Sequence, residues 1–120
     1  MGYIEEIKIE IDKLKDSNKL IIVEGKKDIK ALKNLGLTNV IEISGALFET
    51  IEKVNENEVV LLMDMDTEGK KLYSKLKKQF LGRGVKIDNK LRHLLIRVKL
   101  SHIEGLDTYI KNENIKRNRN

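Results

Sequence analysis

The sequence predicts an α/β fold, with a central, mostly parallel sheet of four strands and helices on both faces. Two observations predict it. Short apolar runs rich in Val and Ile, such as those at residues 20–23 and 58–63, are typical of buried parallel strands. Amphipathic stretches with helical spacing separate these runs, and strands that alternate with helices form parallel sheets. We therefore expect three layers with the sheet in the middle.

The N-terminal stretch is predicted to be an amphipathic helix that precedes the first strand. Four apolar side chains at helical spacing place this helix over residues 3–16. The alternation of Ile7, Ile9 and Ile11 also fits a strand, so a strand remains an alternative here.

The rest of the chain is predicted to alternate between strands and helices. Short apolar runs place strands at residues 20–23, 39–43, 58–63 and 85–87. Apolar residues three and four apart place helices at residues 26–35, 47–54, 67–81, 91–98 and 106–110. Gly36 and the segment at residues 82–84 are expected to close two of these helices, and Ser44 to begin another. Residues 114–120 are basic and have few apolar anchors, so we expect a frayed tail.

Composition restricts both the class of protein and its partners. The chain, residues 1–120, suits one domain with a core over about residues 18–100. The absence of cysteine excludes disulfides, a thiolate zinc site and a cysteine nucleophile. With no long apolar run and no signal-peptide pattern, we expect a soluble, cytoplasmic protein without a membrane partner. The net charge of +5 indicates a polyanionic partner such as nucleic acid, although genome bias also produces lysine-rich chains.

Carboxylates follow two of the predicted strands at the point where each strand ends. Glu24 comes directly after the first strand, and Asp64 and Asp66 follow the third. Because the carboxyl ends of parallel strands share one edge, and ligands bind outside that edge, we expect these side chains to meet. Carboxylates placed together stay ionised only with a counter-charge, and Mg²⁺ is a hard cation that one or two carboxylates hold. The sequence therefore predicts Mg²⁺ as a cofactor.

The turn after the first strand has features of an anion site. Gly25 lets the backbone turn tightly and admits a ligand close to the main chain. Lys26 and Lys27, with a helix N-terminus behind them, favour a phosphate there. A simpler interpretation also fits, in which Glu24 caps the helix and the lysines are solvated.

The turn after the third strand carries the sharper signal. Alternate residues on a strand point to the same side, so Asp64 and Asp66 can bind one ion, and Glu68 follows where the next helix begins. The alternative is that Asp66 caps the helix and Asp64 is a solvated strand end. Two acids directly after a fully apolar strand are costly unless they are paired or bind a metal, which favours the metal site.

Together these two motifs resemble those of the Toprim domain, which occurs in topoisomerases of types IA and II, bacterial primases, recombination-mediator proteins and nucleases of ribosomal RNA maturation. The resemblance rests on IVEGKKD at residues 22–28 and LLMDMDTEG at residues 61–69, and it covers roughly residues 18–100. It implies a three-layer, Rossmann-like Toprim fold. As a lone domain, the chain is most similar to the small stand-alone Toprim proteins of archaea and bacteria, which are related to the nucleases of ribosomal RNA maturation.

The resemblance also implies a role for each residue of the two motifs. Glu24 would act as a general acid or base and lie at the metal with Asp64 and Asp66, which would hold Mg²⁺. Glu68 matches a third acid of type IA topoisomerases that many Toprim nucleases lack, so it is either a ligand or a residue around the metal. Structural positions of the family are matched by Gly25, Asp28 and Gly69.

Polar residues outside the motifs have two interpretations each. His102 and Glu104 either fold back toward the metal or lie exposed, and His93, beside Arg92 and Arg97, is expected to be exposed. The lysines of the helix after the acidic turn form either a solvated face or a surface that binds a phosphate backbone. These lysines, the lysine face, are Lys70, Lys71, Lys75, Lys77 and Lys78. The side chains expected to serve in packing are those of Tyr3, Tyr73 and Tyr109.

These observations favour two functions over a third. The first is a Mg²⁺-dependent enzyme for phosphodiester chemistry on RNA or DNA, acting as a nuclease or in phosphotransfer. The second is a module or subunit of a larger complex that binds nucleic acid through a metal without chemistry. The third, a phospho-acceptor signalling domain, places its paired acids after the first strand, which is the reverse of this chain. The sequence does not separate the first two, and it does not indicate an oligomeric state.

Overall fold

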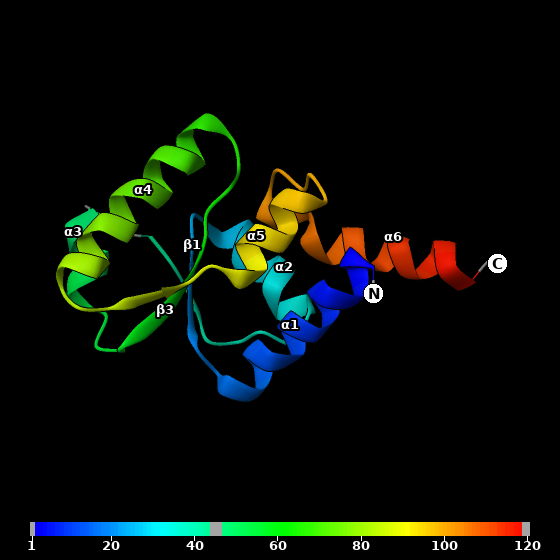
Figure 1. The fold of residues 1–120 in the computed structure, drawn as a ribbon, viewed down its shortest axis with the longest axis horizontal. Helices are drawn as coiled ribbons and strands as arrows, with labels where there is room; N and C mark the ends of the chain where they lie inside the picture. The colour runs from blue at the N-terminus through cyan, green and yellow to red at the C-terminus, as the bar shows by residue number, and fades with distance from the viewer. Residues whose placement is uncertain (1, 44–46, 119–120) are drawn as a thin grey trace.

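The computed structural model describes residues 2–43 and 47–118, and it has the α/β fold that the sequence predicts (Figure 1). Its four strands are all parallel and lie in the order β2-β1-β3-β4. The strands are β1 (Leu20–Val23), β2 (Val40–Glu42), β3 (Glu58–Leu62) and β4 (Lys86–Asp88). The helices are α1 (Tyr3–Ser17), α2 (Lys26–Asn34), α3 (Leu47–Glu52), α4 (Thr67–Gly82), α5 (Lys90–Arg97) and α6 (Leu106–Asn118), with a 3-10 turn, η1 (Ile103–Gly105), before the last.

The two central strands supply both cores of the protein. Successive side chains of a strand point to opposite faces of a sheet, so each strand contributes to two layers. In β3, Val60 and Leu62 belong to the first core, whereas Val59 and Leu61 belong to the second. All four are almost fully buried, which explains why β3 has an unbroken apolar run.

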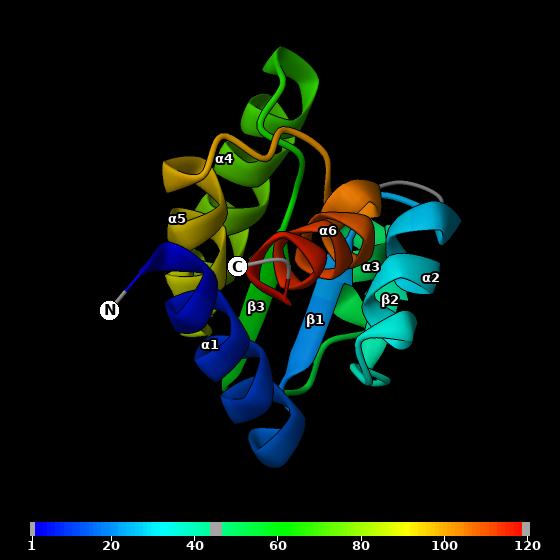
Figure 2. The same cartoon turned by 90° about the vertical axis from the view of Figure 1, so that its right-hand side faces the viewer.

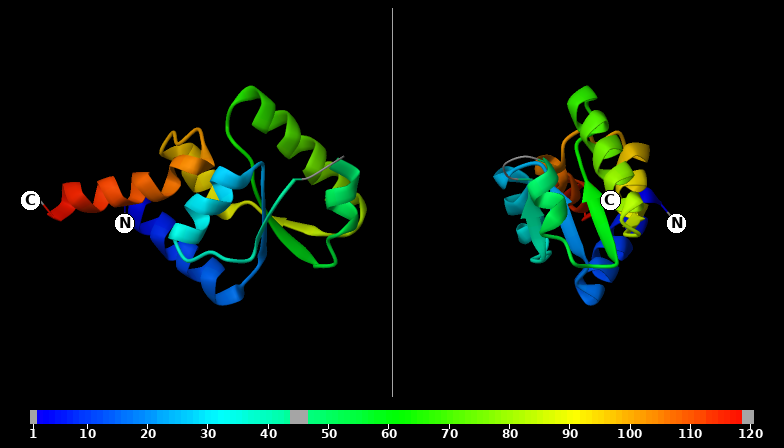
Figure 3. Two further views of the ribbon diagram at one scale, coloured as in Figure 1. Left: turned by 180° about the vertical axis from the view of Figure 1, so that it is seen from behind. Right: turned by 90° about the vertical axis from the view of Figure 1, so that its left-hand side faces the viewer.

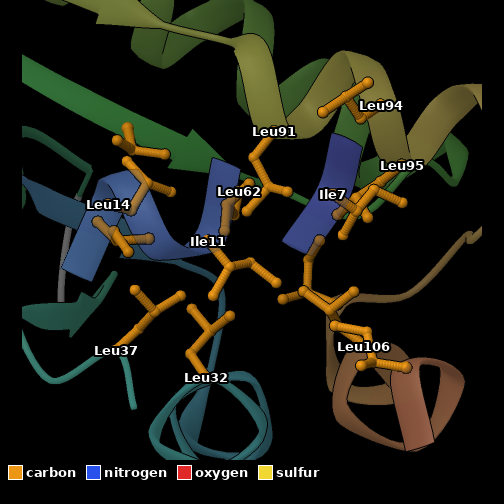
Figure 4. Close-up of a cluster of buried hydrophobic side chains, with 14 of the residues drawn as sticks. Ile7, Ile11, Leu14, Leu32, Leu37, Leu62, Leu91, Leu94, Leu95 and Leu106 are labelled. Atoms are coloured by element: carbon orange, nitrogen blue, oxygen red, sulfur yellow. The ribbon is translucent and has the colours of Figure 1, made fainter. Parts of the chain in front are cut away.

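The first core lies between the sheet and the layer formed by α1, α2, α5 and α6. Figure 2 looks onto this layer, with α6 seen nearly end-on. Leucines and isoleucines from these four helices meet β3 in a continuous apolar cluster (Figure 4). Burying one such side chain stabilises the fold by about 1.5–3 kcal/mol. The helix predicted at the N-terminus is confirmed, and the strand alternative there is wrong, because the buried positions of α1 follow helical spacing.

The second core lies on the opposite face, under α3 and α4. Figure 3 shows both helices together on that side of the sheet. Leu76 and Phe80 of α4 are fully buried against Val59, Leu61 and their neighbours. The expected role of Ser44 lies outside the described residues. In the described part of the chain, no helix has the length and apolar content to cross a membrane.

The C-terminal segment differs most from expectation. A short helix at 106–110 and a frayed tail were predicted, but α6 continues to Asn118. Ile110 anchors its first half in the first core, while polar contacts from α1 hold its second half. These contacts are Lys8 with Asn114 and Glu5 with Arg117. Apolar spacing cannot reveal a helix that polar contacts between distant segments hold in place.

The order of the strands reverses direction between β1 and β3. The chain passes from β1 through α2 to β2 on one side, and from β3 through α4 to β4 on the other. The loops after β1 and β3 therefore diverge and leave an opening between them. In open α/β sheets, ligands bind at this switch point, outside the carboxyl ends of the strands.

Candidate functional site

Glu24 and Asp64 meet at the switch point. Val23, the last residue of β1, lies opposite Leu62, the last residue of β3, so the two strands end side by side. The backbone amide of Asp64 donates a hydrogen bond of 2.7 Å to Oε2 of Glu24. Residues forty positions apart in sequence are thus joined directly, as the parallel arrangement requires.

A cluster of metal-ligating groups lies on the same edge. One ligand atom each from Asp64, Asp66 and His102 lies within 4.8 Å of the other two. Nε2 of His102 is 3.6 Å from Oδ2 of Asp66, and both side chains are about half exposed. Asp64 is half-buried, at the inner end of the cluster. The three groups therefore form an open site that solvent and ligands can reach.

Backbone amides orient the two aspartates. The amide of Ile103 donates to Oδ1 of Asp64 at 2.9 Å, and the amide of Gly69 donates to Oδ1 of Asp66 at 2.8 Å. Asp66 is the N-cap of α4, so the capping interpretation is correct for this residue. Each carboxylate commits Oδ1 to the backbone, and no described residue hydrogen-bonds to either Oδ2. Capping and ion binding are therefore compatible at Asp66.

The loop after α5 completes the cluster. The amide of Met65 donates to the carbonyl oxygen of Ser101 at 2.8 Å, which joins this loop to the acidic turn after β3. The hydrogen bond places the following residue, His102, beside Asp66. Of the two interpretations of His102, the structure therefore supports the one in which the segment folds back toward the acids. Glu104 is exposed, but its charge acts on the buried Asp28.

The carboxylates at this edge of the sheet repel one another. Burial raises the pKa of Glu24, and the charges of Asp64, Asp66 and Asp28 raise it further, although the hydrogen bond from Asp64 opposes this. Burial also raises the pKa of Asp28, and the charge of Asp64 adds to the effect. Several carboxylates thus repel one another at one edge of a chain whose net charge is +5.

Comparison with known proteins identifies this arrangement. The family model of the Toprim domain matches residues 18–89, which run from the start of β1 through the acidic turn after β3 to the end of β4. The chain belongs to the Toprim domain family. Both acidic motifs of this Toprim domain lie within the matched residues.

This Toprim domain has relatives of similar length and a solved structure of similar fold. A UPF0292 protein of Methanosarcina barkeri is 37% identical over 94% of this chain and 84% of its own length. A UPF0292 protein of Methanocaldococcus jannaschii is 32% identical over 89% of this chain and 86% of its own length. A solved structure of a putative protein from Aquifex aeolicus superposes with a TM-score of 0.76 and 32% identity, covering 84% of this chain and 95% of that one.

Gly69 and Gly25, the glycines of the two Toprim motifs, differ in their steric surroundings. A Cβ built on Gly69 would lie 2.1 Å from the carbonyl oxygen of Asp64, so the start of α4 needs a residue without a side chain to pack on the acidic turn. Gly25 has an extended backbone, and a Cβ there would have no atom within 4 Å. The chain bends here between β1 and α2, but this extended backbone does not itself require glycine, whereas the open space agrees with a ligand near the main chain. Asp28 accepts a hydrogen bond from the Gly25 amide at 3.2 Å and holds this turn.

Other predicted site residues of the Toprim domain lie around the cluster rather than in it. Glu24 and Glu68 are outside the group of described ligand atoms that lie within 4.8 Å of one another. Glu68 is exposed. The lysines predicted to contact phosphate are all exposed, and none forms an ion pair with a described residue. They are Lys26, Lys27, Lys70 and Lys71.

Sequence reasoning missed Arg92. It was grouped with exposed neighbours, and His93 and Arg97 are indeed exposed, but Arg92 is only 6% exposed. Its guanidinium lies 4.0 Å from the centre of the Tyr73 ring, so Tyr73 does more than fill a core. The sequence did offer a sign of this burial. Arg92 lies next to Leu91 and close to Leu94 and Leu95, so it borders the buried apolar stripe of α5.

Proposed function

We propose that this protein is a Mg²⁺-dependent enzyme that performs phosphodiester chemistry on nucleic acid, as a nuclease or in phosphotransfer. The observation that carries the proposal is the meeting of Glu24 with the Asp64–Asp66–His102 cluster at the switch point of a Toprim fold. The proposal is tested with labelled single-stranded and structured RNA and DNA, incubated with and without Mg²⁺. Cleavage or joining that depends on Mg²⁺ is the expected result.

The side chains present fit a hard divalent cation. Asp64 and Asp66 each keep an oxygen that accepts no hydrogen bond from a described residue, and the surrounding carboxylates need positive charge. Carboxylate oxygens are the ligands that Mg²⁺ takes, whereas imidazole suits softer metals. We therefore assign Asp64 and Asp66 as ligands and His102 as the group that orients Asp66. A Mg²⁺ ion held by Asp64 and Asp66 would polarise the phosphoryl group and stabilise negative charge on the attacking or leaving oxygen.

Glu24 suits the transfer of a proton. The amide of Asp64 fixes its Oε2 beside the proposed ligands. Burial, the largest cause of its raised pKa, moves proton exchange at Glu24 toward neutral pH relative to an exposed carboxyl group, which suits general acid–base catalysis. The metal ligands and the proton-transfer group then come from the two strands that flank the switch point.

The lysine face supplies a surface for the phosphate backbone. Its five lysines are exposed on α4, the helix whose N-terminus carries Asp66, and none forms an ion pair with a described residue. Lys71, Lys75 and Lys78 lie three and four positions apart and so share one stripe of the helix. A strand of nucleic acid that binds along this stripe would reach the acidic cluster at the N-terminus of α4.

Mg²⁺ is expected to stabilise the protein, because it relieves the repulsion among the carboxylates. By linkage, a concentration 100 times the Kd adds about 2.7 kcal/mol to the free energy of unfolding. The double variant Asp64→Asn, Asp66→Asn should unfold at a higher temperature than wild type without metal and should not respond to Mg²⁺. Asparagine keeps the acceptor for the Ile103 and Gly69 amides, so only the charge and the ligand change. Thermal melts over a series of Mg²⁺ concentrations measure both effects.

The matched control removes two exposed aspartates of α1, Asp12 and Asp16, which lie outside the cluster. This variant should keep the full response to Mg²⁺. A wild-type melting temperature that does not change up to tens of millimolar Mg²⁺ contradicts the metal site.

Reversing charge on the lysine face should weaken nucleic-acid binding without unfolding the protein. In the variant Lys71→Glu, Lys75→Glu, two phosphate contacts are lost, so the slope of log K against log salt should fall by up to about two. Titrations of labelled nucleic acid at several salt concentrations measure the slope. The control variant Lys13→Glu, Lys33→Glu has the same net charge but alters exposed lysines of α1 and α2, on the other side of the sheet. Equal loss of binding in both variants means that net charge, not this face, governs binding.

A further inference from the structure

A cavity of about 360 Å³ lies beside the acidic cluster, between α4 and α5. Its volume is within the range of pockets that hold small organic ligands. Met65 and Ser101, which flank the cluster and join through the 2.8 Å hydrogen bond, form the wall that the cavity shares with it. The remaining lining residues are Lys70, Tyr73, Ser74, Arg92, Ile96, Lys99 and Leu100.

Arg92 places an unneutralised charge in the wall of this cavity. Only 6% of the residue is exposed, and burial lowers the pKa of its guanidinium. Nε donates a long hydrogen bond of 3.4 Å to the carbonyl oxygen of Met63, and the ring of Tyr73 covers one face. No carboxylate of a described residue lies within ion-pair distance. A buried cation without a carboxylate partner costs stability, so a bound anion would complete this site.

Lys99 has a backbone conformation that lysine rarely adopts. Its φ is +60°, at the end of α5. The corresponding positions after α2 and α4 are Gly36 and Gly84, with φ of +85° and +79°. Glycine is the usual residue there because a Cβ is strained in the left-handed region. The chain thus keeps a lysine on the cavity where glycine fits the backbone better.

Part of the lining is apolar. Met65, Leu100 and Ile96 contribute to it, and Ile96 is 45% exposed although it is a large apolar residue. Inorganic phosphate would leave these side chains in water, and an apolar ligand would leave Arg92 unpaired. A ligand that satisfies both parts has an anionic group and a flat, weakly polar body, and a nucleotide has both.

We propose that this cavity binds one nucleotide unit of the nucleic-acid substrate, with its phosphate on Arg92, Lys70 and Lys99 and its base against Ile96 and Leu100. The assignment deepens the proposed function and rests on it for the identity of the substrate. Arg forms planar, bidentate contacts with phosphate, and bases stack on apolar and cationic side chains. A nucleotide held here lies next to the acidic cluster, on the other side of Met65.

Binding without metal tests the cavity separately from catalysis. The ligands are the four ribonucleoside 5′-monophosphates, a trinucleotide with a 5′-phosphate and inorganic phosphate, each titrated calorimetrically. We expect the trinucleotide and at least one mononucleotide to bind at least tenfold more tightly than phosphate, because only they reach the apolar part. Arg92→Met should lose at least tenfold in affinity, and Lys99→Gly should lose several-fold. Lys33→Ala, which is exposed on α2 and does not line the cavity, should bind mononucleotides as wild type does.

Thermal stability separates ligand binding from a structural role. A methionine of similar length fills the space of Arg92 without a buried charge, so Arg92→Met should melt at or above the wild-type temperature. Lys99→Gly should also melt at or above it, because the strain at φ +60° is relieved. Affinity that falls while stability holds supports a ligand site. A lower melting temperature with unchanged affinity shows that Arg92 is structural and overturns the proposal.

The outcomes also separate this proposal from the proposed function. Nucleotides that bind no better than phosphate overturn the cavity assignment, even if the protein cleaves nucleic acid with Mg²⁺. Mononucleotides that bind while the trinucleotide does not show that the cavity takes a free nucleotide, which overturns its role as a substrate subsite. If nucleotide binding depends on Arg92 but no substrate is cleaved, the cavity assignment is upheld and only the proposed enzymatic function is overturned.

Discussion

Replacing Glu24 with glutamine is expected to reduce turnover by about 10²–10⁴-fold and to leave nucleic-acid binding nearly unchanged. Glutamine keeps the size of the side chain and an oxygen that accepts the hydrogen bond from the Asp64 amide. It loses only the proton that Glu24 is proposed to transfer. Single-turnover rates on the labelled substrate panel and binding titrations on the same substrates measure the two quantities.

The matched control is Glu104→Gln, which removes an exposed carboxylate near the same edge and should keep its activity. The pH profile of the wild-type rate identifies the role of Glu24. Because burial raises the pKa of Glu24, the rate is expected to change with pH above the usual titration range of a carboxyl group. The rate rises with pH if Glu24 acts as a base and falls with pH if it acts as an acid. If the wild-type protein binds nucleic acid but neither cleaves nor joins any substrate with Mg²⁺ or Mn²⁺, it is a binding module instead.

Replacing Gly69 with alanine is expected to destabilise the protein by about 2 kcal/mol or more and to abolish its response to Mg²⁺. The new Cβ would lie 2.1 Å from the carbonyl oxygen and 2.6 Å from the carbonyl carbon of Asp64. These are backbone atoms, so no side chain can rotate away, and the acidic turn itself must move. Asp64 and Asp66 then lose their common orientation.

Gly82→Ala is the control for this prediction, because it makes the same change at the other end of α4. A Cβ at Gly82 has no atom within 4 Å, and alanine favours a helix over glycine by up to about 1 kcal/mol. This variant should therefore be as stable as wild type or more stable. Chemical denaturation with and without Mg²⁺ compares the two. A Gly69→Ala protein with wild-type stability and a normal Mg²⁺ response would show that the turn is not held as tightly as the close approach implies.

Local patterns in the sequence determined the sheet and its acidic edge. The apolar run of β3 ends at Asp64 and that of β1 at Glu24, and parallel strands bring such ends together whatever the details of packing. Gly36 and the glycine-containing segment at residues 82–84 marked the ends of α2 and α4, and in the structure Gly36 and Gly84 take the left-handed backbone that favours glycine. Gly69 was noted from its motif alone, since the close approach to Asp64 exists only in three dimensions.

Tertiary structure alone decided which polar residues join the acids. His102 reaches Asp66 because the loop after α5 is tied to the acidic turn by the Met65–Ser101 hydrogen bond, and a contact between distant backbone groups leaves no periodic trace. Arg92 is buried on Tyr73 for a similar reason, since charged residues next to an apolar stripe are usually exposed and only the packing of α4 beside α5 encloses this one. The sequence thus determines where the strands end, because that depends on neighbouring residues, whereas the groups that surround those ends depend on how whole helices and loops pack.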